Sequence, residues 1–167
     1  MIRNKDCRFK YKVLINCSLP KDNTLKIEYV ERSFIIELNK KIIDEWNVRH
    51  PELPEFVNVS ETRLDEVLHI VEKAGDKLEI RDQIIVKAAH LLGGLPWVQA
   101  FSGGNKRTAI LSTTIFLHRN GLNITFPREE QRELRRLLFE IQEDRGQLQQ
   151  GIIDKLILYM RRNVKSL

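Results

Sequence analysis

The hydrophobic pattern of this chain changes its period near Ser33. From that residue onward, apolar side chains recur every three or four positions, which is the spacing of one face of an amphipathic helix. The pattern therefore predicts a mainly α-helical bundle. The predicted helices run from Ser33 to just before Pro51, over residues 61–74, 78–92 and 106–119, from Pro127 to just before Gly146, and around residues 152–160.

Glycine and proline set the predicted helix ends. We expect the third helix to end at Leu92, because two glycines and a proline follow within residues 93–96. Asn120-Gly121 predicts a left-handed helix end, followed by an extended segment over residues 122–126. Pro127 is suited to the first turn of the next helix.

The segment before the helices has a different pattern. Apolar and polar side chains alternate over residues 8–13 and again over residues 25–30, and Pro20 to Asn23 between them has turn chemistry. Such alternation on both sides of a turn predicts a β-hairpin. The expected organisation is therefore a β extension at residues 1–32 and one compact helical domain at residues 33–167.

Composition is consistent with a single globular domain. The 167 residues are 42% hydrophobic and 31% charged. No apolar run approaches the ~20 residues of a membrane span, and the first residues lack a signal-peptide core. We therefore expect a cytoplasmic protein without a membrane partner. The two cysteines, Cys7 and Cys17, lack metal-site spacing and are expected as free thiols, although a hairpin would allow them to approach each other.

The net charge of +5 is compatible with binding phosphates, nucleotides or nucleic acid. A basic nucleic-acid module that uses the hairpin and Arg161-Arg162 is one interpretation. No recognised nucleic-acid motif supports it beyond the charge, so nucleic acid is not the partner that we expect.

The most informative stretch is Phe101-Ser102-Gly103-Gly104-Asn105-Lys106-Arg107. Two glycines and an asparagine allow tight-turn conformations, and helical periodicity begins near Lys106. Unpaired amides and the helix dipole attract anions at a helix start. The stretch is therefore a candidate phosphate cradle. An ordinary helix start with two exposed basic side chains is the alternative.

Residues 101–109 resemble the active-site loop of the Fic/Doc family, and Asn-Lys-Arg-Thr-Ala is similar to the form found in the Doc (death-on-curing) branch. The similarity continues through Ile115 to Gly121 and covers residues 33–162 loosely. It implies a Fic/Doc-like helical bundle. It also implies that the loop binds a nucleotide's phosphates through its backbone amides and side chains, with Ser102, Gly103, Gly104, Asn105, Lys106 and Arg107 as the binding residues.

The chain departs from the family at two positions. Gln99 occupies the place of the catalytic His, and an amide cannot accept a proton at useful pH. Gly103 occupies the place of an acidic metal ligand, so we expect no metal ligand in the loop and a weak dependence on Mg²⁺. The catalytic positions implied by the resemblance are Gln99, Lys106 and Arg107. Ile110 stands where nucleotidyl transferases of the family often have a second Arg.

Three other features of the sequence bear on the site. His90, on the helix that leads into the loop, is the one histidine whose position suits a substitute base, although an ordinary helix histidine is the commoner case. Thr62 and Glu66 resemble the family's inhibitory Glu motif, but Val67 departs from it. Trp97 and Phe101 flank the loop. Phe101 is expected in the core, and Trp97 is more often a core residue, although its ring could instead form a wall for an adenine.

The resemblance leaves several functions open. The favoured one is binding of ATP or another nucleoside triphosphate, with impaired or altered phosphoryl or nucleotidyl transfer to a protein hydroxyl. The alternatives are an active Doc-like toxin kinase or AMP-transferase, and a non-catalytic protein-interaction member. For an active member, the resemblance implies Mg²⁺, a protein target such as a translation factor, and a small antitoxin.

Overall fold

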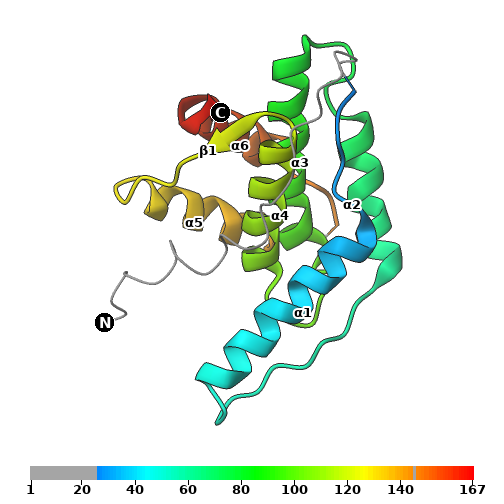
Figure 1. Cartoon of the computed structure of the whole chain (residues 1–167), viewed down its shortest axis with the longest axis vertical. Coiled ribbons are helices and arrows are strands. Elements are labelled where there is room, and N and C mark those ends of the chain that lie inside the picture. Colours follow the sequence, from blue (N-terminus) through cyan, green and yellow to red (C-terminus); the bar gives the residue numbers. More distant parts are fainter. Residues whose placement is uncertain (1–25, 145) are drawn as a thin grey trace.

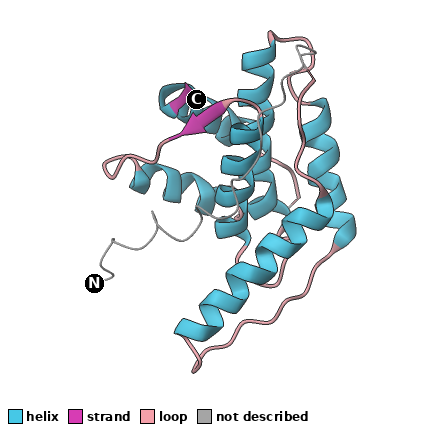
Figure 2. Cartoon of the chain, in the orientation of Figure 1, coloured by secondary structure: helices cyan, strands magenta, loops and turns pink. Residues whose placement is uncertain are grey.

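The computed structural model describes residues 26–144 and 146–167, and within them it is mainly helical (Figures 1 and 2). This confirms the predicted fold class. The elements are α1 (Arg32–Arg49), α2 (Glu61–Lys73), α3 (Ile80–Val98), α4 (Asn105–Arg119), β1 (Leu122–Ile124), α5 (Gln131–Glu140), α6 (Gln150–Asn163) and β2 (Val164–Ser166).

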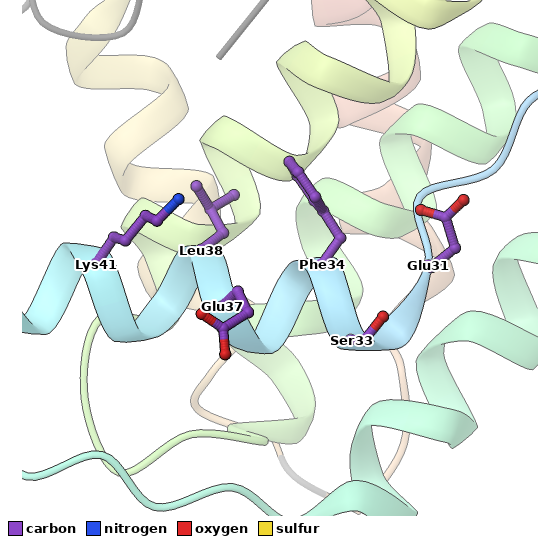
Figure 3. A pocket seen from close by; sticks show the side chains of 6 residues that line it. All are labelled: Glu31, Ser33, Phe34, Glu37, Leu38 and Lys41. Carbon is purple, nitrogen blue, oxygen red and sulfur yellow. The ribbon is translucent and has the colours of Figure 1, made fainter. Parts of the chain in front are cut away.

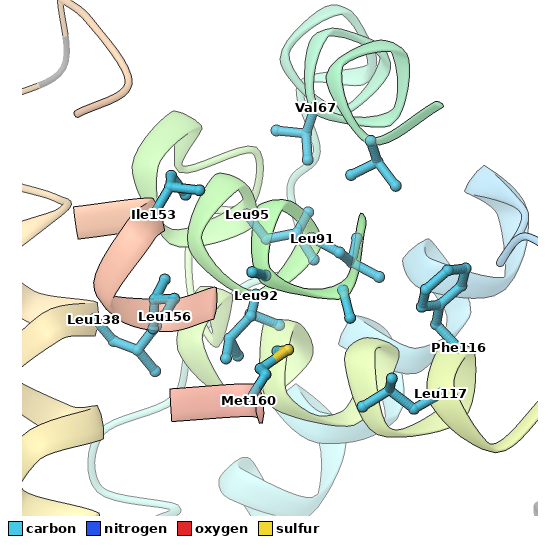
Figure 4. Close-up of a cluster of buried hydrophobic side chains, with 14 of the residues drawn as sticks. Val67, Leu91, Leu92, Leu95, Phe116, Leu117, Leu138, Ile153, Leu156 and Met160 are labelled. Atoms are coloured by element: carbon cyan, nitrogen blue, oxygen red, sulfur yellow. The ribbon is translucent and has the colours of Figure 1, made fainter. Parts of the chain in front are cut away.

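Helix α3 forms the centre of the bundle and packs against α2, α4 and α6. Its buried side chains face those of the surrounding helices in one continuous apolar core (Figure 4). Burial of apolar area is the main favourable term in folding. The core therefore fixes the position of α3 and α4, and with them the loop that joins the two helices. The core side chains labelled in Figure 4 are Val67, Leu91, Leu92, Leu95, Phe116, Leu117, Leu138, Ile153, Leu156 and Met160.

The predicted end of α3 at Leu92 is wrong, because the helix continues to Val98. Gly93 and Gly94 allow close helix contacts instead of breaking the helix. A Cβ at Gly93 would lie 2.8 Å from Ile153 Cδ1, and a Cβ at Gly94 would lie 2.8 Å from Val67 Cγ1. Both distances are shorter than a normal van der Waals contact. The missing side chains therefore let α6 and α2 pack directly against α3.

The segment after α4 forms one strand of a small sheet. Gly121 has φ 73°, as the predicted left-handed helix end requires. Strand β1 pairs antiparallel with β2, with Leu122 opposite Ser166 and Ile124 opposite Val164. The sequence indicated β1 as an extended segment, but β2 was not predicted. Pro127 does not open α5 as predicted, because residues 127–130 form a turn closed by a hydrogen bond from Glu130 N to Pro127 O (3.1 Å).

Residues 26–30 have an extended backbone and belong to no strand, so this part of the predicted hairpin is wrong. They lie against the end of α4, where Glu28 and Asn120 exchange two hydrogen bonds of 2.9 Å each. The rest of the predicted hairpin, with Cys7 and Cys17, lies outside the described residues. None of the helices in the described part of the chain is both long and apolar enough to cross a membrane.

Candidate functional site

The candidate loop joins the two helices that pack most extensively against each other, α3 and α4. Gln99 ends α3 in the left-handed region, with φ 47° and ψ 56°. Gly104 precedes α4, also in the left-handed region, with φ 72°. Helix α4 then begins at Asn105, which confirms the predicted helix start near Lys106 to within one residue.

Asn105 closes the loop on itself. Its Nδ2 donates to the carbonyl oxygen of Phe101 (2.7 Å), and its Oδ1 accepts from the amide of Phe101 (3.1 Å). Phe101 is buried in the core, as predicted. The side chain of Asn105 therefore anchors the loop to the core, which fixes the path of the residues between them.

The loop is also attached to the segment between α1 and α2, residues 50–60, which we call the connector. The connector runs back alongside α1 (Figure 1). Ser60 N donates to Ala100 O (2.7 Å) and Ser102 N donates to Asn58 O (3.0 Å). The Ser102 hydroxyl accepts from Asn58 N (3.2 Å) and donates to the carbonyl of Phe56. The amide and the hydroxyl of Ser102 are thus used within the protein.

The backbone amides of residues 103–107 remain available. The first paired amide of α4 is that of Thr108, which donates to Gly104 O (2.9 Å). Within the described ranges, the amides before it, back to Gly103, donate to no protein group. Free amides at a helix start, together with the positive end of the helix dipole, are a suitable site for an anion.

Arg107 lies next to these amides and faces the connector. Its Nη2 is 3.2 Å from Glu55 Oε2 and 3.5 Å from Oε1. Its guanidinium lies over the ring of Trp46, 4.9 Å from the centroid. The Arg107 and Glu55 side chains are 40% and 32% exposed, so a ligand can reach both of them. Arg107 therefore lies beside the free amides, with its guanidinium paired to the Glu55 carboxylate.

Glu55 occupies the space beside Gly103. A Cβ at Gly103 would lie 2.3 Å from Glu55 Oε2. Asn47 fixes the backbone of residue 55, since its Nδ2 donates to Glu55 O (2.9 Å) and its Oδ1 accepts from Glu55 N (2.8 Å). Sequence reasoning missed Glu55, because a single Glu in a connector has no pattern that assigns it to a loop far along the chain.

Asn39, on α1, bonds the loop from the protein interior. Its Nδ2 donates to Gly103 O (2.9 Å) and to Thr108 Oγ1 (3.0 Å). The side chain is buried, and its Oδ1 has no hydrogen-bond partner among the described residues. Asn39 was also missed, although its place next to Leu38 on the apolar face of α1 marks it as a buried polar residue.

The structure separates the two basic residues of the loop. Lys106 Nζ donates to Gln142 Oε1 (2.6 Å) and lies 3.9 Å from the centroid of the Phe139 ring. Burial lowers the pKa of the Lys106 ammonium. Lys106 therefore points toward the end of α5, whereas Arg107 points toward the connector. Gln99 lies between the core and the surface at the same end of the bundle.

The other candidate residues lie outside this arrangement. Nδ1 of His90 is 2.8 Å from Val86 O within its own helix. Glu66 is exposed on α2, and Trp97 is buried, as predicted. Among the residues that the structure describes, no group of three or more His, Cys, Asp or Glu is arranged to hold a metal ion.

A groove of about 420 Å³ lies along α1, where Phe34, Leu38 and Lys41 project from the helix (Figure 3). Glu31, Ser33 and Glu37 complete its lining. None of these residues belongs to the loop, so this groove is separate from the candidate phosphate site.

Comparison with protein-family models identifies the Fic/DOC family over residues 29–117, just over half of the chain. The matched region contains α1 to α3, the connector, the loop and most of α4. Comparisons with curated proteins and with solved structures give no match. On the family model, with the helical fold and the loop between α3 and α4, this chain belongs to the Fic/DOC family.

Proposed function

We propose that this protein binds the phosphates of a nucleoside triphosphate, with ATP as the first candidate, at the loop from Ser102 to Arg107. The observation that supports this proposal most strongly is the row of free amides at residues 103–107 beside the Arg107 guanidinium. A phosphate accepts hydrogen bonds from such amides, and Arg presents a planar fork that matches its oxygens. Asn105 contributes by holding the loop in shape through Phe101.

We further propose that group transfer is impaired. A protein hydroxyl that attacks a phosphoryl group must lose its proton, and general base catalysis is worth about 10²–10⁴-fold. Gln99 offers an amide at this position and cannot take the proton. Nδ1 of His90 bonds Val86 O within α3, and among the described residues no hydrogen bond joins His90 to the loop. Binding and positioning are therefore the parts of the family's chemistry that this loop retains.

The assignment to the Doc branch remains part of the proposal. It rests on Asn105 to Ala109, and with it come the translation-factor target and the antitoxin as candidate partners. A non-catalytic role in protein contacts is the second candidate function. It is supported by two exposed apolar side chains of the connector, Leu53 (66% exposed) and Phe56 (77% exposed).

A thermal-shift screen of nucleotides, with and without Mg²⁺, tests the proposal. A ligand that binds only the native state at 100 times its Kd adds about 2.7 kcal/mol to the free energy of unfolding. For a domain of this size we expect an increase in Tm of roughly 5–10 °C. Arg107→Ala should remove the increase. Arg49→Ala is the matched control. Arg49 lies on the surface of α1, and its one ion pair among the described residues is with Glu45, so this change should leave the increase intact.

Two results would contradict the proposal. If no nucleotide raises the Tm, the loop does not bind a nucleotide. If Arg107→Ala responds to ATP as the parent protein does, ATP binds elsewhere. In either case the protein-contact function becomes the better account of this chain.

A further inference from the structure

We propose that Glu55 supplies, from the connector, the carboxylate that the loop lacks at Gly103, and that it makes nucleotide binding dependent on Mg²⁺. This inference rests on the proposed function, since it concerns the same phosphate site. It replaces the expectation of weak Mg²⁺ dependence, which considered only the loop's own side chains.

The Glu55 carboxylate fills the space that a side chain on residue 103 would need. A Cβ on residue 103 would lie 2.3 Å from Glu55 Oε2 and 3.0 Å from Glu55 Cδ. A side chain at position 103 and the carboxylate of Glu55 therefore cannot both be present in this arrangement. The carboxylate lies where an acidic side chain on the loop would begin. The glycine is thus the residue that gives Glu55 access to the loop.

Glu55 is held in this position by its backbone. Two hydrogen bonds of 2.9 Å and 2.8 Å join residue 55 to Asn47 on α1. Three residues further along the connector, Asn58 is bonded to Ser102 of the loop. The backbone is therefore anchored on both sides, while the carboxylate remains partly exposed and can change its partner.

Charge explains why a cation is needed. With no ligand, the Glu55 carboxylate is neutralised by Arg107, 3.2 Å away. A phosphate that takes over Arg107 leaves two anionic groups close together, which is unfavourable. Mg²⁺ is bound in proteins by one or two carboxylates together with phosphate oxygens and water. Glu55 and the nucleotide's phosphates fit this donor set, and Mg²⁺ would neutralise charge on the phosphates.

A second observation concerns Asn39, which bonds Gly103 of the same loop. Its Oδ1 is buried and has no hydrogen-bond partner in the part of the chain that the structure describes. A buried oxygen acceptor usually has a donor, which is often an ordered water. The water shell that Mg²⁺ retains is a source of such a donor.

Calorimetric titration of ATP, with and without Mg²⁺, tests the inference. The parent should bind ATP at least ten-fold more tightly with Mg²⁺. In Glu55→Gln this ratio should fall below about three, because metal-free binding improves and Mg²⁺-dependent binding weakens. Glu52→Gln is the matched control, since Glu52 lies on the same connector and pairs with His50. It should behave like the parent.

Gly103→Ala provides an independent variant, because its Cβ should displace the Glu55 carboxylate without changing any charge. It should lower the ratio of ATP affinities with and without Mg²⁺, as Glu55→Gln does. Electron paramagnetic resonance with Mn²⁺ in place of Mg²⁺ gives a second readout. The parent with ATP should immobilise Mn²⁺ beyond the level seen with ATP alone, and Glu55→Gln should lose this effect.

The possible outcomes separate the two proposals. If Glu55→Gln tightens ATP binding equally with and without Mg²⁺, Glu55 only blocks Arg107 and the metal role is wrong. If the parent binds ATP equally tightly with and without Mg²⁺, the metal role is also wrong, although the phosphate site then stands. If the parent binds no ATP under either condition, the proposed function fails and this inference fails with it.

Discussion

The side chain of Asn105 bonds both backbone polar groups of Phe101: its Nδ2 donates to the carbonyl oxygen (2.7 Å), and its Oδ1 accepts from the N–H (3.1 Å). Phe101 is a core residue, so this pair attaches the start of α4 to the hydrophobic interior. Both ends of the Asn105 side chain are thereby used. In this structure Asn105 acts through the shape of the loop, and the neighbouring backbone amides of residues 103–107 donate to no protein group in the described part of the chain.

Asn105→Ala should lower the free energy of unfolding by about 1–3 kcal/mol, because it leaves the polar groups of Phe101 without partners. ATP affinity should fall at least ten-fold, since the loop loses its shape. Urea denaturation and calorimetry measure the two effects. Asn120→Ala is the matched control: Asn120 makes a similar reciprocal pair with Glu28, so it should lose comparable stability and keep its ATP affinity. Equal ATP affinity in both variants would contradict this role for Asn105.

The close packing of α3 gives a second prediction. Gly93→Ala should lower the free energy of unfolding by about 1–3 kcal/mol, because its Cβ would meet the ends of Ile153, Ile141 and Leu156 at 2.8–2.9 Å. The gain in helix propensity, about 1 kcal/mol, offsets part of this cost. Gly151→Ala in α6 is the control, since nothing lies within 4 Å of its added Cβ. It should leave stability unchanged or raise it. Gly93→Ala at parental stability would contradict the packing account.

The sequence predicted the helices wherever their apolar faces repeat, because burial of these faces is local information. It failed at α3, where Gly93 and Gly94 look like a helix end. Their role depends on Val67 and Ile153, which no local pattern connects to them. Strand β2 was missed for the same reason, since its partner is β1, about forty residues earlier.

The candidate site likewise contains residues that the sequence could assign to it and residues that it could not. The loop and Arg107 could be found from their order along the chain. Glu55 and Asn39 could not be assigned to the site, because only the folding of the connector and α1 against the loop brings them there. The hydrogen bond from Lys106 to Gln142 is likewise set by tertiary packing.

Tyr159 should make stability sensitive to alkaline pH. Burial, followed by the charges of Glu130 and Glu133, raises the pKa of its hydroxyl from 10.0 to about 12. Between these values the unfolded chain has lost the proton that the folded protein keeps, so the free energy of unfolding should fall as pH rises from about 10 to about 12. Urea denaturation across this range measures the slope. In Tyr159→Phe the slope should be smaller, and an unchanged slope would show that another group causes it.

Gln99→His tests the proposed loss of the base. His is among the residues enriched in the left-handed region, so position 99 can accept it at φ 47°. If Glu55 already provides the carboxylate, this single change should raise transfer from labelled ATP to proteins of a cell extract by about 10²–10⁴-fold. Gln99→Asn is the control, because Asn tolerates the same backbone and offers no base. A histidine variant no more active than the asparagine variant would show that the site lacks more than its base.

The most direct test of the phosphate site follows the backbone amides themselves. In a ¹H–¹⁵N nuclear magnetic resonance titration of the parent protein with ATP and Mg²⁺, the largest shift changes should occur at residues 103–107, where the amides are free. In Arg107→Ala these changes should disappear at the same ATP concentration. Shift changes centred instead on the groove along α1, at Glu31 to Lys41, or no changes at the loop, would contradict the account.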